Sequence, residues 1–275
     1  MPELPEVEIA ARNLRGWTEG RTLVRADPDA KAKRIFRPAT PASFAAAVAG
    51  ARFGEVRRIG KHLLVALEKD AAPVGLLVHL GMTGKWLRRE EGDPPTRFSR
   101  ARLHLDDGSV LHFDDLRLFG RLRVVPAARF HEVPEVAKLG RDPLEHGIDV
   151  DVLAEALGRS RLPVKVRIMD QAILPGVGNI YASEALFRAK IDPRRKANDL
   201  SRAEARRLAG TVIEAMREGI ARQEGPEITY VEEGGENPFL VYAREGEPCP
   251  RCKKGRIVRV VQAQRSTFFC PRCQK

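Results

Sequence analysis

Cys249-Pro-Arg-Cys252 and Cys270-Pro-Arg-Cys273 stand near the end of the sequence and use all four cysteines, with 17 residues between the pairs. Two CxxC pairs at this spacing are typical of a four-thiolate, tetrahedral zinc site. Two disulfides or a redox pair are the alternative. We find no secretory signal in the sequence, and two equal pairs suit a metal better than one redox motif. The pattern therefore predicts one structural Zn²⁺ with no open coordination position.

The segment between the cysteine pairs alternates like two short strands around a turn, from Arg256 to Phe268. A hairpin of this size folds only when a metal holds it. Its turn would present a basic side chain, and Arg265 is the candidate. An ordinary exposed arginine on a zinc ribbon is the alternative interpretation.

Charge is concentrated in the same part of the chain. Residues 241–275 contain nine Lys or Arg and two Glu, which supply +7 of the formal net charge of +11. Such density favours a polyanionic partner, most often nucleic acid, although a solvated basic surface would look the same. Among the 275 residues 43% are hydrophobic and no apolar run approaches a membrane span, so we expect a globular cytosolic protein.

The middle of the chain favours helices. The predicted helices are Val150–Leu157, Val164–Ile173, Ile180–Ala189 and Ser201–Arg222. Ser201 and Glu204 form a capping-box pattern at the start of the last one. The turn Leu174-Pro-Gly-Val-Gly-Asn179 places glycines before an Asn N-cap, which would leave backbone N–H groups open to a phosphate. A tight helix–helix turn without any ligand is the alternative.

The part of the chain before Pro126 favours strands after an opening helix. The predicted strands are Val56–Leu67, Gly75–Leu87, Ala101–Leu105, Val110–Phe113 and Gly120–Val125, with a short helix in Thr40–Gly50. Asp107-Gly108 is a strong hairpin signal between two of the strands. Many short strands at this spacing indicate a sandwich or barrel.

The chain begins Met1-Pro2-Glu3-Leu4-Pro5-Glu6-Val7-Glu8. If Met1 is removed, Pro2 offers a secondary amine, which is a nucleophile near neutral pH and forms an iminium with an aldehyde-level sugar carbon. Glu3 and Glu6 then lie close enough for proton transfer. The structural alternative is a helix start with Pro5 at its first position, acidic residues in its first turn and Gly16 as its stop.

Two further stretches lie beside predicted strands. Gly60-Lys61-His62 offers a lysine that could serve as acid or base next to an iminium, and His79-Leu-Gly-Met82 offers a donor for phosphate. A strand-edge lysine and a hydrogen-bonded structural histidine are the alternatives. Met82 stands among glycines, which is unusual for a core methionine.

Six motifs in a fixed order span nearly the whole chain: Met1–Glu8, Gly60-Lys61, His79–Met82, Asp115–Gly120, Gly176–Ser183 and Gln264–Cys270. Together they resemble the formamidopyrimidine-DNA glycosylase/endonuclease VIII family of base-excision repair enzymes. The N-terminal stretch is more similar to the formamidopyrimidine branch.

This resemblance implies a bifunctional DNA glycosylase with AP (apurinic or apyrimidinic site) lyase activity. Pro2 would attack C1′ of the damaged nucleotide and leave a Schiff base. Glu3 would be the proton donor, and Glu6 would line the same pocket. Lys61 matches the residue assigned to β-elimination, and Arg265 matches the one assigned to δ-elimination.

The resemblance also implies DNA contacts. Lys61, His79, Asn179 and Arg265 would bind the phosphates that flank an extruded nucleotide. Met82, Arg117 and Phe119 would fill the space left by the base and wedge the stack. The basic position expected on a helix is filled by Arg161.

The implied fold is α+β. It has an N-terminal β-sandwich with an N-terminal helix (residues 1–127), a helix–two-turn–helix domain (135–225) and a C-terminal β-hairpin zinc finger (239–275). The implied partner is double-stranded DNA with damaged bases or abasic sites, bound by a monomer.

Two departures from the family leave the lesion open. Leu118 replaces a basic residue of the wedge loop, and the loop at residues 227–238 is shorter and more acidic than is typical. Formamidopyrimidines, 8-oxoguanine and, as in endonuclease VIII, oxidised pyrimidines all remain possible substrates. A non-catalytic lesion-binding protein is a further alternative, against which Pro2, Glu3 and Lys61 together argue.

Overall fold

The computed structural model describes residues 2–69, 73–222, 227–228 and 237–275. The chain divides into two compact units, which we describe separately. The sheet unit contains residues 1–2, 6–137 and 223–229, and the helical unit contains residues 3–5, 138–222 and 230–275. The division falls in the first turn of α1 (Leu4–Thr18).

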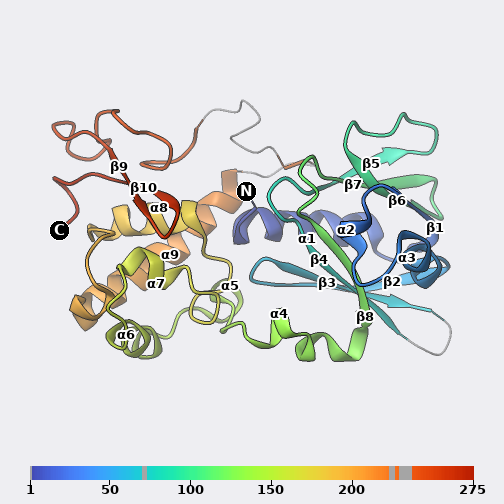
Figure 1. Cartoon of the computed structure of the whole chain (residues 1–275), viewed down its shortest axis with the longest axis horizontal. Coiled ribbons are helices and arrows are strands. Elements are labelled where there is room, and N and C mark those ends of the chain that lie inside the picture. Colours follow the sequence, from blue (N-terminus) through green and yellow to red (C-terminus); the bar gives the residue numbers. More distant parts are fainter. Residues whose placement is uncertain (1, 70–72, 223–226, 229–236) are drawn as a thin grey trace. The chain divides into compact units, whose positions relative to one another are not determined.

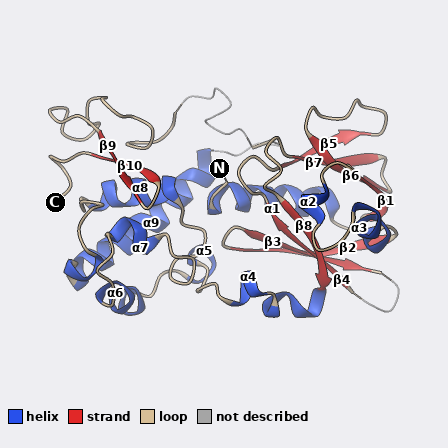
Figure 2. Ribbon diagram, viewed as in Figure 1, coloured by secondary structure: helices blue, strands red, loops and turns tan. Residues whose placement is uncertain are grey.

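The sheet unit contains eight antiparallel strands in the order β5-β7-β6-β1-β2-β3-β4-β8. Their bounds are β1 Thr22–Pro28, β2 Ala51–Ile59, β3 His62–Glu68, β4 Val74–His79, β5 Lys85–Glu90, β6 Ser99–Leu105, β7 Ser109–Asp114 and β8 Arg121–Pro126. Strands β1 and β2 pair through only two residue pairs, and the strands on either side of this short junction form the two layers seen in Figure 2. The α+β class is confirmed, with the sandwich layers joined into one hydrogen-bonded sheet.

Turns divide two of the predicted strands. Gly60, with a positive φ of 55°, separates β2 from β3, and residues 80–84 separate β4 from β5. Apolar residues flank both turns, so the hydrophobic pattern predicted one continuous strand where the structure has two. The predicted hairpin at Asp107-Gly108 is confirmed, since it joins β6 to β7.

Short helices accompany the sheet. They are α2 Lys33–Phe36, α3 Pro41–Val48, the 3₁₀ helix η1 Ala127–Glu132 and α4 Pro134–Ala137 (Figure 1). The helix predicted within Thr40–Gly50 is confirmed, and Thr40 caps it by accepting a bond from the Ser43 N–H at 3.1 Å. The stop predicted at Gly16 of α1 is wrong. The helix continues to Thr18, because one interior glycine costs only about 1 kcal/mol.

The helical unit contains α5 Pro143–His146, α6 Val150–Gly158, α7 Val164–Ile168, α8 Asn179–Ala189, η2 Ala197–Asp199 and α9 Arg202–Arg222. The capping box at α9 is confirmed, because the Ser201 N–H donates to Glu204 and the Glu204 N–H to Ser201. A core of buried aliphatic side chains from α6 to α9 holds these helices together. No described helix is long and apolar enough to cross a membrane.

The C-terminal hairpin consists of β9 Val258–Gln262 and β10 Arg265–Phe269, paired in register. Ala263 and Gln264 form its two-residue turn, and both have positive φ. A turn of this kind matches the right-handed twist of the two strands. Arg265 is exposed directly after this turn, as predicted.

Candidate functional site

Glu3 is fully buried and lies at the N-terminus of α8, within the helical unit. Its carboxylate accepts hydrogen bonds from the N–H groups of Gly178 and Ile180, both at 2.9 Å, and of Tyr181 at 3.2 Å. A Cβ on Gly178 would lie 2.4 Å from Glu3 Cδ, so only glycine permits this approach. The helix dipole adds a further attraction for the carboxylate.

Two predictions about the turn before α8 are therefore corrected. The backbone N–H groups expected to hold a phosphate instead hold the chain's own Glu3 carboxylate. The N-cap is Gly178 rather than Asn179, which is the first residue of the helix. Asn179 does not cap because its side chain bonds the zinc hairpin, with Nδ2 donating to Ser266 O at 2.9 Å.

The turn itself is fastened to the N-terminal segment. The Leu4 N–H donates to Gly176 O at 3.1 Å, and Leu4 is buried in the helical core. Gln171 closes the turn by accepting from the Gly176 N–H and donating to Val177 O, both at 2.9 Å. The residue after Pro2 is thus fixed in position by backbone and side-chain bonds.

Lys165 of α7 is buried beside Asn179. Its Nζ donates to Asn179 Oδ1 at 2.5 Å, to Thr267 Oγ1 at 2.7 Å and to Ser266 O at 3.2 Å. Burial lowers the pKa of Lys165 to about 8; Glu3 opposes this shift and Arg265 adds to it. Lys165 therefore joins two helices to the hairpin strand that begins with Arg265.

The four cysteines lie with all their sulfur atoms within 4.8 Å of one another. Cys249 Sγ and Cys273 Sγ are 3.8 Å apart, and Cys252 Sγ and Cys270 Sγ are 4.0 Å apart. Four thiolates at about 2.3 Å from a tetrahedral zinc would be about 3.8 Å apart, so the residues fit one structural Zn²⁺. The metal would hold the hairpin and, with it, the position of Arg265.

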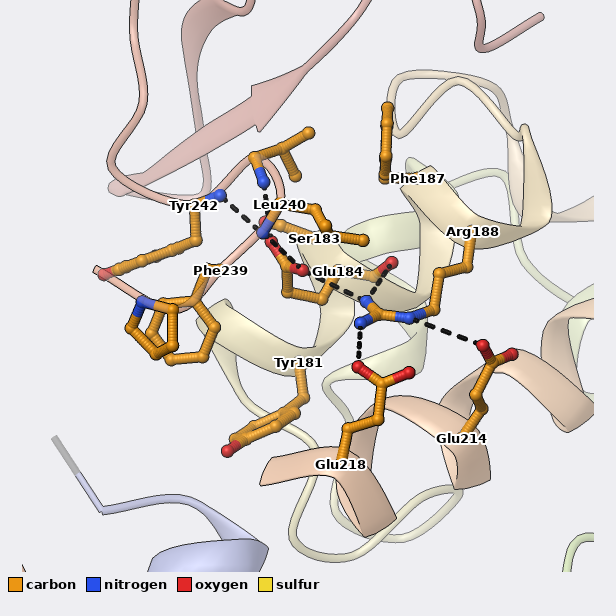
Figure 3. A network of polar contacts seen from close by, with 12 residues as sticks. Tyr181, Ser183, Glu184, Phe187, Arg188, Glu214, Glu218, Phe239, Leu240 and Tyr242 are labelled. Carbon is orange, nitrogen blue, oxygen red and sulfur yellow. Dashed lines mark hydrogen bonds and ion pairs between the residues drawn. The ribbon is translucent and has the colours of Figure 1, made fainter. Parts of the chain in front are cut away.

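A buried carboxylate on α8 fixes the segment that leads into the zinc finger (Figure 3). Glu184 accepts from the N–H groups of Leu240 and Val241, both at 2.9 Å, and of Tyr242 at 3.1 Å. Arg188 donates to Glu184 at 3.0 Å and to Glu218 of α9 at 2.7 Å. Glu184 of α8 and Lys165 of α7 thus give the C-terminal segment two separate attachments to these helices.

The sheet unit places Lys61 in the turn between β2 and β3, and His62, His79 and Arg121 pair across β3, β4 and β8. Arg58 connects this turn to α1, since it bonds Glu8 at 2.8 Å and Gly60 O at 3.3 Å. The Gly81 N–H donates to His79 Nδ1, so the ring proton lies on Nε2. Burial lowers the pKa of His79 to about 3, with His62, Lys61 and Arg121 adding to the shift, so His79 is a neutral donor near pH 7.

The wedge loop, residues 115–120, is held by its first residue. The Asp115 carboxylate accepts from Thr83 Oγ1 at 2.6 Å and from the N–H groups of Arg117 at 3.2 Å and Gly120 at 2.8 Å. A Cβ on Gly81 would lie 2.5 Å from the backbone of Phe119. The turn that carries Met82 and the loop that carries Arg117 and Phe119 are therefore in direct contact.

Comparison with known proteins agrees with this geometry. Three family models match: the formamidopyrimidine-DNA glycosylase N-terminal domain (residues 1–122), the formamidopyrimidine-DNA glycosylase H2TH domain (139–230) and the zinc finger found in FPG and IleRS (246–275). Formamidopyrimidine-DNA glycosylases of Rhodospirillum centenum and Paracoccus denitrificans are each 39% identical, over the full length of both chains. The chain belongs to the formamidopyrimidine-DNA glycosylase family.

Solved structures of the family have the same fold. The MutM (FPG) protein of Thermus thermophilus is 38% identical, with a TM-score of 0.82 over 99% of this chain and 98% of that one. MutM in complex with carbocyclic 8-oxo-G containing DNA is 27% identical, with a TM-score of 0.88 over 100% of both chains. The Lactococcus lactis enzyme in complex with DNA containing an abasic site is 26% identical, with a TM-score of 0.88 over 99% of both.

The structure groups the predicted site residues within each unit. The sheet unit contains buried Pro2 and Glu6, the neighbours Lys61 and His79, and the turn with Met82 in contact with the loop that carries Arg117 and Phe119. The helical unit contains Glu3, the neighbours Asn179 and Arg265, and the four cysteines. Arg161 is exposed between α6 and α7, and no hydrogen bond or ion pair joins it to the other described residues.

Sequence reasoning missed Lys165, Glu184 and Arg58. Lys165 is buried in α7 together with Val164 and Ile168. A lysine among apolar residues of a helix could have indicated a buried charge with hydrogen-bond partners. Glu184 lies among buried residues of α8. A buried carboxylate is rarely left unpaired, so this position likewise indicates hydrogen-bond or ion-pair partners.

Proposed function

We propose that this protein is a base-excision repair enzyme, a bifunctional DNA glycosylase/AP lyase that removes oxidised bases and then cuts the strand. The observation that carries the proposal is the fixed carboxylate of Glu3, one residue from the Pro2 amine and held by three backbone N–H groups. Membership of the formamidopyrimidine-DNA glycosylase family supports it. Its place of action is chromosomal DNA in the bacterial cytoplasm, since its relatives are bacterial.

In the proposed reaction the lone pair of the Pro2 nitrogen attacks C1′ of the damaged nucleotide. The C1′–N bond breaks, and its electron pair leaves with the base, which takes up a proton. Opening of the sugar gives an iminium at C1′ that acidifies C2′. Loss of a C2′ proton expels the 3′ phosphate (β-elimination), and a second elimination expels the 5′ phosphate (δ-elimination).

The residues have distinct roles in this scheme. Glu3 delivers and accepts protons at the sugar, and Glu6 shapes the pocket beside it. Lys61 promotes β-elimination and Arg265 promotes δ-elimination. One observation supports the second assignment, because the zinc hairpin and Lys165 fix the strand that begins with Arg265.

DNA binding in this proposal uses both units. Lys61, His79, Asn179 and Arg265 contact phosphates, with Arg161 as a further basic contact. Met82, Arg117 and Phe119 occupy the space of the extruded base, whose unstacking costs a few kcal/mol. The domains have the bounds 1–127, 135–225 and 239–275, and the enzyme acts as a monomer.

Reduction with borohydride tests the lyase chemistry. A duplex with an abasic site should become covalently attached to the Met1-processed protein, because borohydride reduces the iminium to a stable amine. The matched control retains a short N-terminal extension, which removes the free Pro2 amine and should give no adduct. Absence of an adduct with processed, zinc-loaded protein would refute the proposal and favour a non-catalytic lesion-binding protein.

The lesion requires its own experiment. Excision rates for formamidopyrimidine, 8-oxoguanine and oxidised pyrimidines should be compared side by side in one duplex context. We expect formamidopyrimidine to be excised fastest, since the relatives bear that name. Faster excision of oxidised pyrimidines would instead assign the endonuclease VIII specificity. Most of the loop that bears on this choice, residues 227–238, lies outside the described residues.

A further inference from the structure

Arg121 stands at the start of β8, immediately after the wedge loop. It pairs in register with His79 of β4, which pairs with His62 of β3. Its Nη1 donates to Gly120 O at 2.9 Å, which orients the guanidinium at this edge of the sheet. None of the roles discussed above uses Arg121.

Helix α2 brings two more arginines to the same edge. It packs against β8 through the buried Ile35 and Phe36, so the neighbouring Arg34 and Arg37 remain exposed. The Arg34 guanidinium lies 5.0 Å from the centre of the Phe119 ring, and that of Arg117 lies 5.1 Å from the same ring. We call Arg34, Arg37 and Arg121 the β8 arginine cluster.

No ion pair with a described carboxylate neutralises the charges of this cluster. Burial lowers the pKa of Arg121, and the positive charges of Arg34 and Arg37 lower it further, with Asp115 opposing. The Asp115 carboxylate already bonds Thr83 and the backbone of its own loop. Among the described residues no carboxylate forms an ion pair with any of the three arginines.

The next outward-facing arginine of the same strand is different. Arg123 pairs with Glu135 of α4 at 3.1 Å. Like charges held together without a counter-ion repel each other, and an anionic ligand relieves that repulsion. Planar guanidinium groups suit the oxygens of a phosphate, and two of the three here, those of Arg34 and Arg37, belong to exposed side chains.

We propose that the β8 arginine cluster is an additional phosphate-binding site, which holds the DNA backbone beside the wedge side chains. This inference rests on the proposed function for its ligand, a nucleic-acid strand rather than a free nucleotide. Its position next to Phe119 and Arg117 favours the backbone, because those side chains are themselves proposed to enter the base stack. The site would also supply positive charge in the loop region where Leu118 replaces a basic residue.

The salt dependence of binding tests this site. The ligand is a duplex with a reduced, uncleavable abasic site, titrated between 50 and 200 mM salt. Each lost phosphate contact should reduce the slope of log Kd against log salt by about 0.9. The ratio of the Arg121→Gln Kd to the wild-type Kd should therefore be about 3.5-fold smaller at 200 mM than at 50 mM salt. For the variant in which Arg34, Arg37 and Arg121 are all replaced by Gln, this ratio should be about 40-fold smaller. An undamaged duplex should show the same changes, because phosphate contacts do not read sequence.

Arg123→Gln is the matched control in the same strand and should leave the slope unchanged. Arg121→Lys should retain most of the slope, because it retains the charge. The proposal would be overturned if the triple variant had the same slope as the wild type. It would also be overturned if Arg123→Gln changed the slope as much as Arg121→Gln does. Should the triple variant fail to fold, Arg37→Gln at its exposed position gives the same test for a single contact.

Borohydride trapping of the wild-type protein separates the two proposals. Normal trapping with an unchanged slope in the variants would refute only the arginine site. A reduced slope without trapping in the wild type would refute only the lyase function.

Discussion

Glu184 in the helical unit is buried and Arg121 in the sheet unit is partly buried, and both have ionisable side chains, yet their surroundings differ. Glu184 accepts three backbone N–H bonds and pairs with Arg188. Arg121 has two other arginines for neighbours and forms no ion pair with a described carboxylate. The Glu184 carboxylate is satisfied by groups within the fold, whereas Arg121 has no carboxylate partner among the described residues.

The same contrast extends to other residues of the two units. In the helical unit Glu3 and Lys165 are buried, and each makes at least three hydrogen bonds. A buried charge costs free energy unless it is paired in this way, so these residues fix the positions of their neighbours. Substitutions should therefore reduce stability in the helical unit and change salt dependence in the sheet unit.

The largest effect is expected for Glu184→Ala. It leaves three N–H groups and Arg188 without their acceptor, so the free energy of unfolding should fall by about 3–5 kcal/mol in urea titrations. The control is Glu155→Ala, which removes an exposed ion pair with Arg159 and should cost at most about 1 kcal/mol. Equal losses in the two variants would show that the Glu184 network does not stabilise the fold.

Lys165 should give a smaller, pH-dependent effect. Its pKa of about 8 in the folded protein lies below the ordinary value of 10.5, so between these pH values the unfolded chain binds more protons. The free energy of unfolding must then rise with pH in this window, by at most about 1.4 kcal/mol per pH unit. Below pH 8 the full cost of burying the charged lysine lowers the stability of the folded protein.

The measurement is the free energy of unfolding of the wild type minus that of Lys165→Met, from pH 7.5 to 10. The difference should increase in favour of the wild type as pH rises. A difference that is constant, or that decreases with pH, would contradict the lowered pKa. The substitution Lys196→Met, in the same unit, provides a lysine control.

Features that depend on local chemistry could be predicted from the sequence. The zinc ligands, the capping box at Ser201 and the hairpin at Asp107-Gly108 each involve residues close together in the chain, whose spacing dictates their geometry. Strand β1 was missed because Arg25 and Asp27 interrupt the apolar alternation that marks a strand.

Residues whose partners come from distant segments could not be predicted. Lys165 bonds a hairpin strand about 100 positions later, and Glu184 bonds backbone groups 56 to 58 positions later. The phosphate site expected on the backbone N–H groups before α8 was wrong for the same reason, because the carboxylate that occupies those donors comes from residue 3. Glycine spacing predicts an anion site but not which anion fills it.

The smallest effect concerns Leu118, which adopts a positive φ of 57° in the wedge loop. This backbone conformation costs a branched side chain about 1 kcal/mol and is tolerated by asparagine. Leu118→Asn should therefore raise the free energy of unfolding by about 0.5–1 kcal/mol, after the loss of some side-chain burial. Leu116→Asn, in the same loop but without a positive φ, should change it by less than about 0.5 kcal/mol. A gain confined to Leu118 would show that the sheet unit retains strain, as well as unpaired charge, in the loop proposed to enter DNA. If the two substitutions changed the free energy of unfolding equally, the two units would differ in unpaired charge but not in backbone strain.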